Sequence, residues 1–309
     1  MDPEVAAAVA VLPPEPPALP VGDWQGRRAR FNASAAEMNA RLTPPQDVDV
    51  ETVQATVTDG TSIDLRIYRR QTSPSGGIVL YLHGGGHFCC DVDAGDPNCR
   101  RYASESGATL VSVDFRLAPE HPYPGAIEDA YAGLAWAADH AKRLGGDASR
   151  IAVMGDSAGG GMAAGLALLA RDRGGPAISR QVLIYPMLDD TTAGPDPLIE
   201  PFLAWRYDDN VTGWQCLLGE RFGTDDVAPY AAPTRATDLS GLPPAYVEVG
   251  QLDAFRDEDV SYATRLSRAG VDVELIVRPG VPHDFELIAP EADVTRRAFS
   301  DRARVLSGV

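Results

Sequence analysis

The sequence has almost no lysine and a shortage of positive charge. Only Lys142 is a lysine, and 44 acidic residues face 27 basic ones in 309 residues, which gives a formal net charge of -17 at pH 7. Proteins bind nucleic acids and anionic membranes through an excess of Lys and Arg. The charge therefore argues against either as the main partner, and we expect a small-molecule ligand.

Long apolar runs are also missing. No stretch reaches the roughly 18 apolar residues that a membrane-spanning helix needs. The N-terminus carries Asp2 and Glu4 where a secretory signal would be positively charged. We therefore expect a cytoplasmic protein. With 44% hydrophobic residues, the chain can still bury a sizeable core.

Cysteines are few. Their number and spacing fit neither a disulfide framework nor a zinc site of paired cysteines, so we expect reduced thiols at Cys89, Cys90, Cys99 and Cys216. His83, His87 and Cys89 could share a metal only from one face of a helix, and the three glycines after His83 make a helix implausible. No phosphate-binding glycine motif is present. The sequence therefore predicts no metal and no cofactor.

Apolar runs and helical stretches alternate along the chain, which predicts an α/β fold with a mostly parallel sheet of about eight strands. Asp59-Gly60 separates the first two runs as a hairpin turn would, so the sheet should open antiparallel. The expected strands are 51–57, 62–70, 78–83, 109–114, 150–155, 181–185, 245–249 and 272–277, and the expected helices are 125–143, 158–171, 257–269 and 291–305.

Two segments lie outside this alternation. Residues 1–48 include a stretch in which Phe31, Ala35, Met38 and Leu42 share one helical face. Residues 187–242 are too long for a structureless loop, so we expect a small helical subdomain over an active site. The remaining ranges, 49–186 and 243–309, would form the core. Trp24, Trp205 and Trp214 lie in the two outer segments, where they would pack these onto the sheet or line an apolar pocket.

Ser157 lies in Gly155-x-Ser157-x-Gly159, directly after an expected strand and before an expected helix. In that context GxSxG is typical of a nucleophile elbow, a sharp turn that presents the serine hydroxyl at a helix N-terminus. A serine needs a base to take its proton and an acid to orient that base. In proteins with this type of elbow, the acid follows the serine in the chain and the histidine follows the acid.

His283 is the only histidine after Ser157, and it follows the last expected strand. The acid should stand on a loop just past a strand, where Asp253 is found. Asp189 and Asp190 remain weaker alternatives for the acid. Asp257 and Glu258 lie where the next helix begins, so complementing the helix dipole explains them.

The glycines of "HGGG", residues 83–86, follow the third expected strand. Attack on an ester carbonyl forms an oxyanion, and glycines offer closely approachable N–H donors to stabilise it. We expect Gly85, Gly86 and Ala158 to form the oxyanion hole, with Gly84 as an open alternative.

Together these motifs resemble those of hormone-sensitive-lipase-type α/β-hydrolases, the bacterial HGGG/GDSAG esterases. The matching pieces, in order, are "HGGG", "DFRLAPEHPYPGAIED", "GDSAGG", "GQLDAFRDE" and "VPHDFE". The resemblance implies a catalytic triad of Ser157, Asp253 and His283, a cap made of residues 1–48 and 187–242, and hydrolysis of short- to medium-chain acyl esters without a cofactor.

The sequence departs from that pattern at His87, where an aromatic residue commonly follows HGGG, and at Gly161, where Asn commonly follows GDSAGG. Neither change touches the triad. We expect a substrate pocket lined by His87, Phe88, Phe202, Trp205 and Trp214. An amidase, a thioesterase, a non-catalytic ligand-binding receptor and a homodimer stay open as alternatives.

Overall fold

A single eight-stranded sheet organises the molecule in the computed structural model, which describes residues 1–13, 16–192 and 194–309. The strand order is β1-β2-β4-β3-β5-β6-β7-β8. β1 pairs antiparallel with β2 and β2 with β4, whereas every other pair is parallel. The strands are β1 (Val48–Thr56), β2 (Ser62–Arg70), β3 (Ile78–Leu82), β4 (Thr109–Val113), β5 (Ile151–Asp156), β6 (Arg180–Ile184), β7 (Ala245–Gly250) and β8 (Val273–Arg278).

This architecture confirms the predicted fold class and the antiparallel opening of the sheet. Between β1 and β2, Gly60 has a φ of +88°, a left-handed conformation that glycine adopts without strain. The Asp59 side chain accepts a hydrogen bond from the amide of Thr61 and stabilises this turn. All residues of β3 and β4 are buried, as expected for parallel strands covered on both faces.

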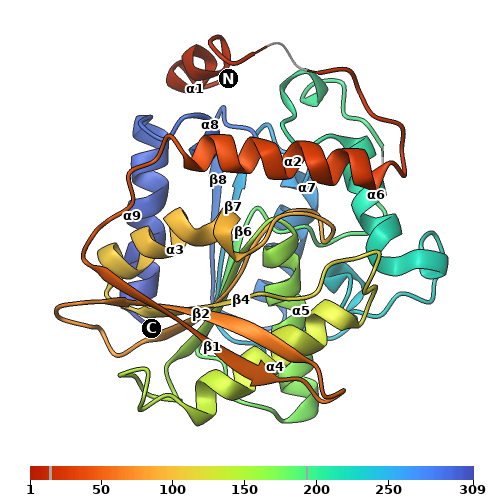
Figure 1. The fold of residues 1–309 in the computed structure, drawn as a ribbon. Coiled ribbons are helices and arrows are strands. Elements are labelled where there is room, and N and C mark those ends of the chain that lie inside the picture. Colours follow the sequence, from red (N-terminus) through yellow and green to blue (C-terminus); the bar gives the residue numbers. More distant parts are fainter. Residues whose placement is uncertain (14–15, 193) are drawn as a thin grey trace.

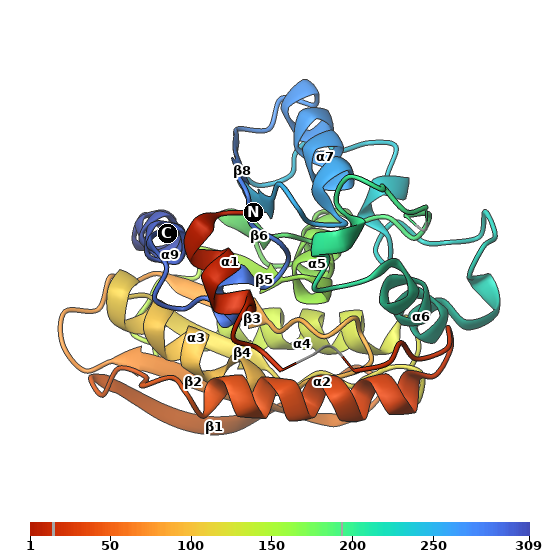
Figure 2. The same cartoon turned by 90° about the horizontal axis from the view of Figure 1, so that it is seen from above.

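Helices cover the two faces of the sheet (Figures 1 and 2). One face packs against α4 (Gly125–Asp139), α5 (Ala158–Arg173) and α7 (Arg256–Arg268). The other packs against α3 (Val92–Ser106) and α9 (Asp293–Ser307), with the short helices α1 (Pro3–Val9) and α8 (Phe285–Ile288) beside them. The four predicted helices correspond to α4, α5, α7 and α9.

Helix α3 was not among the predicted helices, and its residues show why. It contains Pro97, and among its buried positions only Val92 and Tyr102 carry large apolar side chains, the others being small. The helix begins where the Asp91 side chain accepts hydrogen bonds from the amides of Asp93 and Ala94. Packing against α9 and the sheet outweighs this weak local preference.

Helices α2 (Trp24–Asn39) and α6 (Tyr207–Leu218) lie over the carboxyl ends of the parallel strands (Figure 1). They are joined by an ion pair between the buried Arg27 guanidinium and Asp209, 2.7 Å apart. The hydroxyl of Thr212 on α6 also accepts a hydrogen bond from the amide of Gly22, just before α2. Two segments separated by about 180 residues therefore form one layer above the sheet.

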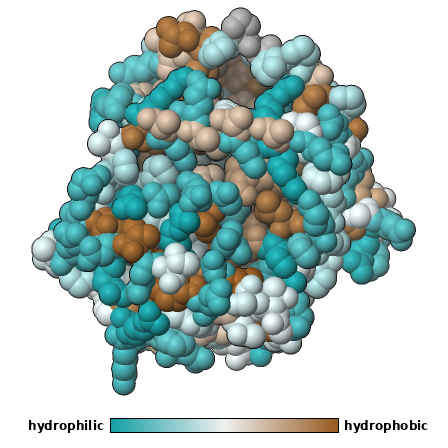
Figure 3. All heavy atoms as spheres, viewed as in Figure 1, coloured by the Kyte–Doolittle hydropathy of each residue, from teal (hydrophilic) through white to brown (hydrophobic). Residues whose placement is uncertain are grey.

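The face of the molecule that carries α2 is mostly hydrophilic, and its apolar side chains form separate small patches (Figure 3). Within residues 1–13, 16–192 and 194–309, no helix is both long enough and apolar enough to span a bilayer.

Candidate active site

Ser157 forms a sharp turn between β5 and α5. Its φ of +55° is unfavourable for a residue with a side chain, so the surroundings must hold it. The Ser157 amide donates to the carbonyl of Ile184, and the Ser157 carbonyl accepts from the amides of Met187 and Gly161. These bonds to the β6 end and to α5 fix the strained turn.

The two glycines of the motif allow the strand and the helix to approach closely. A Cβ at Gly155 would overlap the carbonyl of Gly159, and a Cβ at Gly159 would overlap the carbonyl of Leu82 at the end of β3. A side chain at either position would move Ser157 away from the sheet edge. The GxSxG spacing is therefore a packing requirement of this turn.

His283 lies between Ser157 and Asp253 and is hydrogen bonded to both. Its Nε2 is 2.9 Å from the Ser157 hydroxyl, and its Nδ1 is 2.7 Å from a carboxylate oxygen of Asp253. The other Asp253 oxygen accepts a hydrogen bond from the amide of Phe255. All three side chains follow parallel strands, β5, β7 and β8, whose carboxyl ends meet at one edge. The structure thus brings together the three residues that the sequence singled out.

The surroundings of His283 favour its protonated form. Burial lowers the pKa of the imidazole, but the carboxylates of Asp253 and Asp284 act in the opposite direction and raise the pKa to about 9. The His283 ring also packs edge-on against Tyr185 and Phe255, with centroids 4.5 and 5.2 Å away. These contacts fix the plane of the ring that bridges serine and carboxylate.

The alternative acids are engaged elsewhere. Asp190 forms a two-bond ion pair with Arg235, and Asp189 accepts from the hydroxyl of Thr191. Glu258 does more than complement the dipole of α7, because it is buried and accepts hydrogen bonds from the amides of Leu188 and Asp189. It thereby ties α7 to the loop after β6.

The glycine loop after β3 lies beside Ser157. Gly85 and Gly86 have positive φ angles of +114° and +57°, and a Cβ on Gly86 would overlap the Trp205 ring. In the described part of the chain, the amides of Gly85 and Gly86 have no hydrogen-bond acceptor. The Gly84 amide, by contrast, donates to Asp156 at 3.1 Å. Gly84 is therefore occupied, which leaves Gly85 and Gly86 as the free donors of this loop.

Asp156 is a residue of the site that the sequence analysis did not single out. Besides the bond from the Gly84 amide, its carboxylate accepts a hydrogen bond from the hydroxyl of Tyr81. Burial raises its pKa to about 7, although these two bonds oppose the shift. Its place inside GxSxG was the only sequence signal, because nothing local indicates a bond to a glycine 72 residues earlier.

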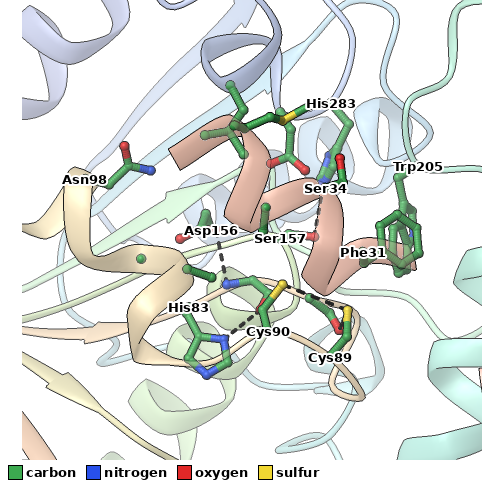
Figure 4. A pocket seen from close by; sticks show the side chains of 18 of the residues that line it. Phe31, Ser34, His83, Cys89, Cys90, Asn98, Asp156, Ser157, Trp205 and His283 are labelled. Carbon is green, nitrogen blue, oxygen red and sulfur yellow. Dashed lines mark hydrogen bonds between the residues drawn. The ribbon is translucent and has the colours of Figure 1, made fainter. Parts of the chain in front are cut away.

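A cavity of about 180 Å³ opens above Ser157 and His283 (Figure 4). Helix α2 forms one wall of the cavity, to which Phe31, Ser34, Ala35 and Met38 contribute. Three of the four residues predicted to share a helical face, Phe31, Ala35 and Met38, therefore line the cavity, whereas Leu42 does not. The Trp205 ring packs on Phe31 with centroids 5.2 Å apart and closes another side.

Among the five predicted pocket residues, only Trp205 lines this cavity, so the expected lining needs correction. Phe88 is fully buried behind Phe31 and Trp205. Phe202 is 37% exposed, in the short helix η1 (Glu200–Phe202). His87 and Trp214 pack against each other away from the cavity. The sequence could not place them, because their direction depends on how 187–242 folds back onto the core.

The histidines of the glycine loop are embedded in the protein interior. The His83 ring stacks on Phe115 at 4.2 Å, and burial lowers the pKa of His83 and of His87 to about 4. Among the residues that the structure describes, no three His, Cys, Asp or Glu side chains lie close enough together to hold a metal ion.

Comparisons with known proteins agree with this geometry. Residues 79–287 match the model of a family described as having the alpha/beta hydrolase fold. The chain is 38% identical over 294 residues to Carboxylesterase NlhH of Mycobacterium tuberculosis, with 88% of each chain covered. It is 34% identical to Ethyl acetate hydrolase of Pseudomonas putida, covering 84% of this chain and 81% of the relative.

The structure of a "Bacterial Heroin Esterase" superposes with a TM-score of 0.90 at 37% identity, covering 100% of this chain and 97% of that one. The chain therefore belongs to the alpha/beta hydrolase family, and its resemblance to the hormone-sensitive-lipase-type esterases is confirmed. Within that family it is a carboxylic ester hydrolase.

Proposed function

We propose that the protein hydrolyses short- to medium-chain acyl esters with Ser157 as nucleophile, through a covalent acyl-enzyme. The observation that carries this proposal is the pair of hydrogen bonds that joins Ser157, His283 and Asp253. A serine hydroxyl becomes an effective nucleophile when an imidazole can take its proton, and a carboxylate holds that imidazole in position.

In this mechanism the Ser157 oxygen attacks the ester carbonyl while its proton passes to Nε2 of His283. The negative charge that forms on the carbonyl oxygen would be stabilised by the amides of Gly85, Gly86 and Ala158. His283 then gives the proton to the leaving alcohol, and a water molecule repeats the sequence to release the acid. Asp253 accepts the Nδ1–H bond and stabilises the imidazolium that forms in each half.

The cavity supports a small, uncharged substrate. Its volume of about 180 Å³ falls below the roughly 300 to 1,000 Å³ of pockets that hold drug-sized ligands. The carboxylates of Asp156 and Asp284 line it, and its described lining includes neither Lys nor Arg. Both features favour a short acyl ester over a long-chain or anionic one.

We further propose that residues 1–48 and 187–242 form the cap of the enzyme. Helix α2 and Trp205 line the cavity, and the Arg27–Asp209 ion pair joins the two segments above the sheet. The cap would then set the preferred chain length, because Phe31, Met38 and Trp205 line the cavity.

The test is the Ser157→Ala variant, assayed with p-nitrophenyl esters of two to twelve carbons. We expect the rate to fall by roughly 10⁴ to 10⁶, while circular dichroism and the urea midpoint stay as in the parent. Undiminished hydrolysis by Ser157→Ala would refute the nucleophile. A rate that rises with chain length up to twelve carbons would refute the chain-length preference alone.

The same three groups could act on amides or thioesters, since acyl-enzyme chemistry is common to all three substrates. Matched ester, amide and thioester substrates with one acyl group separate these activities, and we expect the ester to be turned over fastest. A cytoplasmic location and a homodimer stay predictions from the sequence, and light scattering after size-exclusion chromatography tests the homodimer.

A further inference from the structure

Two adjacent thiols lie beside the glycine loop and face the same cavity as Ser157 (Figure 4). The sulfurs of Cys89 and Cys90 are 4.0 Å apart. Neighbouring side chains on an extended chain point in opposite directions, but Cys90 has a φ of +67°, which breaks that alternation. The Cys90 amide donates to Asn32 on α2 at 2.8 Å and holds this conformation.

Cys89 is tied to the loop that would supply the oxyanion hole. Its amide and its thiol both donate to the carbonyl of Gly85, at 3.0 and 3.1 Å. A chemical change at the Cys89 sulfur would therefore alter the hydrogen bonding of Gly85, which the proposed mechanism places next to the substrate carbonyl. The mechanism proposed above uses neither thiol.

The separation of the two sulfurs indicates which chemistry suits them. A disulfide needs a sulfur–sulfur distance of about 2.05 Å, roughly half of the separation here. Zinc takes three or four protein ligands, and the described residues offer no group of three His, Cys, Asp or Glu close enough together. An atom that bonds to only two thiolates suits this pair better. If its bonds to sulfur are about as long as a zinc–thiolate bond, about 2.3 Å, it can bridge the two sulfurs with little movement of either side chain.

We propose that Cys89 and Cys90 form a dithiol binding site for trivalent arsenicals of the type R–As=O, and that its occupation inhibits the enzyme. Two arsenic–sulfur bonds form and the arsenic–oxygen double bond breaks. The oxygen leaves with the two thiol protons as water. Arsenic stays trivalent throughout, so the reaction needs no oxidant or reductant.

The two cysteines differ in access, and this difference sets the order of the two bonds. Cys90 is half-buried and meets the reagent first, whereas Cys89 is 1% exposed. The hydrogen-bonding contact between the two thiols and burial raise the pKa of the Cys89 thiol, so Cys89 reacts poorly with a reagent in solution. Once arsenic is held by Cys90, closure onto Cys89 is intramolecular and correspondingly favoured.

Occupation of the site would inhibit in two ways. The Cys89 thiol loses the proton that it donates to the Gly85 carbonyl, so the glycine loop loses one of the hydrogen bonds that hold it in place. The organic group on arsenic points into the cavity, where Phe31 and Trp205 offer aromatic walls.

The experiment treats the full chain with one equivalent of phenylarsine oxide and measures intact mass. We expect one phenylarsenic adduct, formed with loss of water, which survives excess 2-mercaptoethanol and is removed by 2,3-dimercaptopropanol. Cys90→Ser and Cys89→Ser should each lose the adduct that survives the monothiol. Cys216→Ser, which removes a buried thiol outside this cavity, is the matched control and should keep it.

Ester hydrolysis is followed in parallel, each protein being compared with its own untreated rate. The parent and Cys216→Ser should lose at least nine tenths of their activity at one equivalent, and Cys90→Ser should lose little. A monothiol-resistant adduct that persists in Cys90→Ser, or no adduct on the parent, overturns the proposal. The mass readout does not depend on esterase activity, so failure of the proposed function and failure of the dithiol site are distinguished.

Discussion

The carboxylate of Asp156 accepts a hydrogen bond from the amide of Gly84 at 3.1 Å. This bond joins the residue before Ser157 to the glycine loop that follows β3. It fixes where Gly85 and Gly86 stand relative to the hydroxyl that attacks, so Asp156 is a positioning residue of the proposed mechanism.

Asp156→Ala should therefore lower kcat by roughly ten- to a hundredfold. Removing one oxyanion-hole donor completely lowers kcat by about 10² to 10³, and a glycine loop that is only loosened should lower it less. Asp156→Asn, which keeps one acceptor oxygen, should lose less. Tyr81→Phe is the control, since it removes the other hydrogen bond to Asp156 and leaves the Gly84 bond. Steady-state kinetics alongside urea unfolding checks this. An unchanged kcat in Asp156→Ala would show that the loop holds its position unaided.

The pH dependence of kcat/KM should report the environment of His283. The imidazole must be neutral to accept the serine proton, and its folded pKa is raised to about 9. Raising the pH through that value removes the proton and increases the rate, so activity should climb between about pH 7 and 9. An imidazole without these carboxylate neighbours would make kcat/KM rise near pH 6.5 instead. Initial rates from pH 5 to 10 decide between the two, and a plateau already reached at pH 7 contradicts the raised pKa.

Glu258 should make the protein less stable as the pH rises. Burial raises its pKa to about 8, against bonds from Leu188 and Asp189 that lower it. Between the unfolded pKa near 4.5 and about 8, the folded state holds a proton that the unfolded state has lost. The unfolding free energy therefore falls across this window, by at most about 1.4 kcal/mol per pH unit.

The variant that tests this is Glu258→Gln, whose side chain is neutral and still accepts from the two amides. Urea unfolding at pH 5 and pH 8 should show the parent losing stability relative to Glu258→Gln. Glu258→Ala, which leaves both amides unpaired, should be destabilised at either pH by roughly 1 to 3 kcal/mol for each unpaired amide. A parent and Gln variant that respond to pH identically would refute the assignment.

The buried Arg302 should matter more than any surface arginine of α9. Its guanidinium is fully buried and pairs with Glu248 and Glu286, each at 2.6 Å. Arg302→Met would leave the buried Glu286 without its cation, at a cost of about 3 to 5 kcal/mol, whereas Glu248 would keep its ion pair with Arg278 at 2.9 Å. Arg304→Met on the same helix removes only an exposed pair with Glu274 and should cost less than about 1 kcal/mol. Equal urea midpoints for the two variants would contradict this.

The Arg302 network also bears on the site. Glu286 accepts a hydrogen bond from the hydroxyl of Tyr185, whose ring packs against His283. The cost of Arg302→Met should therefore be accompanied by a change in the pH profile, which Arg304→Met would leave as in the parent.

Much of this protein could be predicted from local sequence because the signals are local. A buried parallel strand is a continuous apolar run. Gly155 is required by its contact with Gly159 within one strand, one turn and one helix, although Gly159 itself packs on the carbonyl of Leu82 in the neighbouring strand β3. The chain order of Ser157, Asp253 and His283 follows from which strand ends carry them. For that reason the sheet, four helices and the three hydrogen-bonded residues all appear where the sequence placed them.

What escaped prediction depends on contacts between distant segments. Helix α3 carries Pro97 and few large apolar residues, so only packing against α9 and the sheet reveals it. The bond between Asp156 and Gly84 and the inward face of Phe31 likewise require the folded chain.

The sequence by itself determined the fold class and the three side chains that the structure joins by hydrogen bonds, since each lies in a short motif whose spacing physical chemistry constrains. Only the tertiary structure decided which glycine amides stay free, which aromatic rings meet the cavity, and how far the pKa of His283 moves. Those properties arise from burial and from charges that neighbouring segments bring together, and no single stretch of the chain contains them.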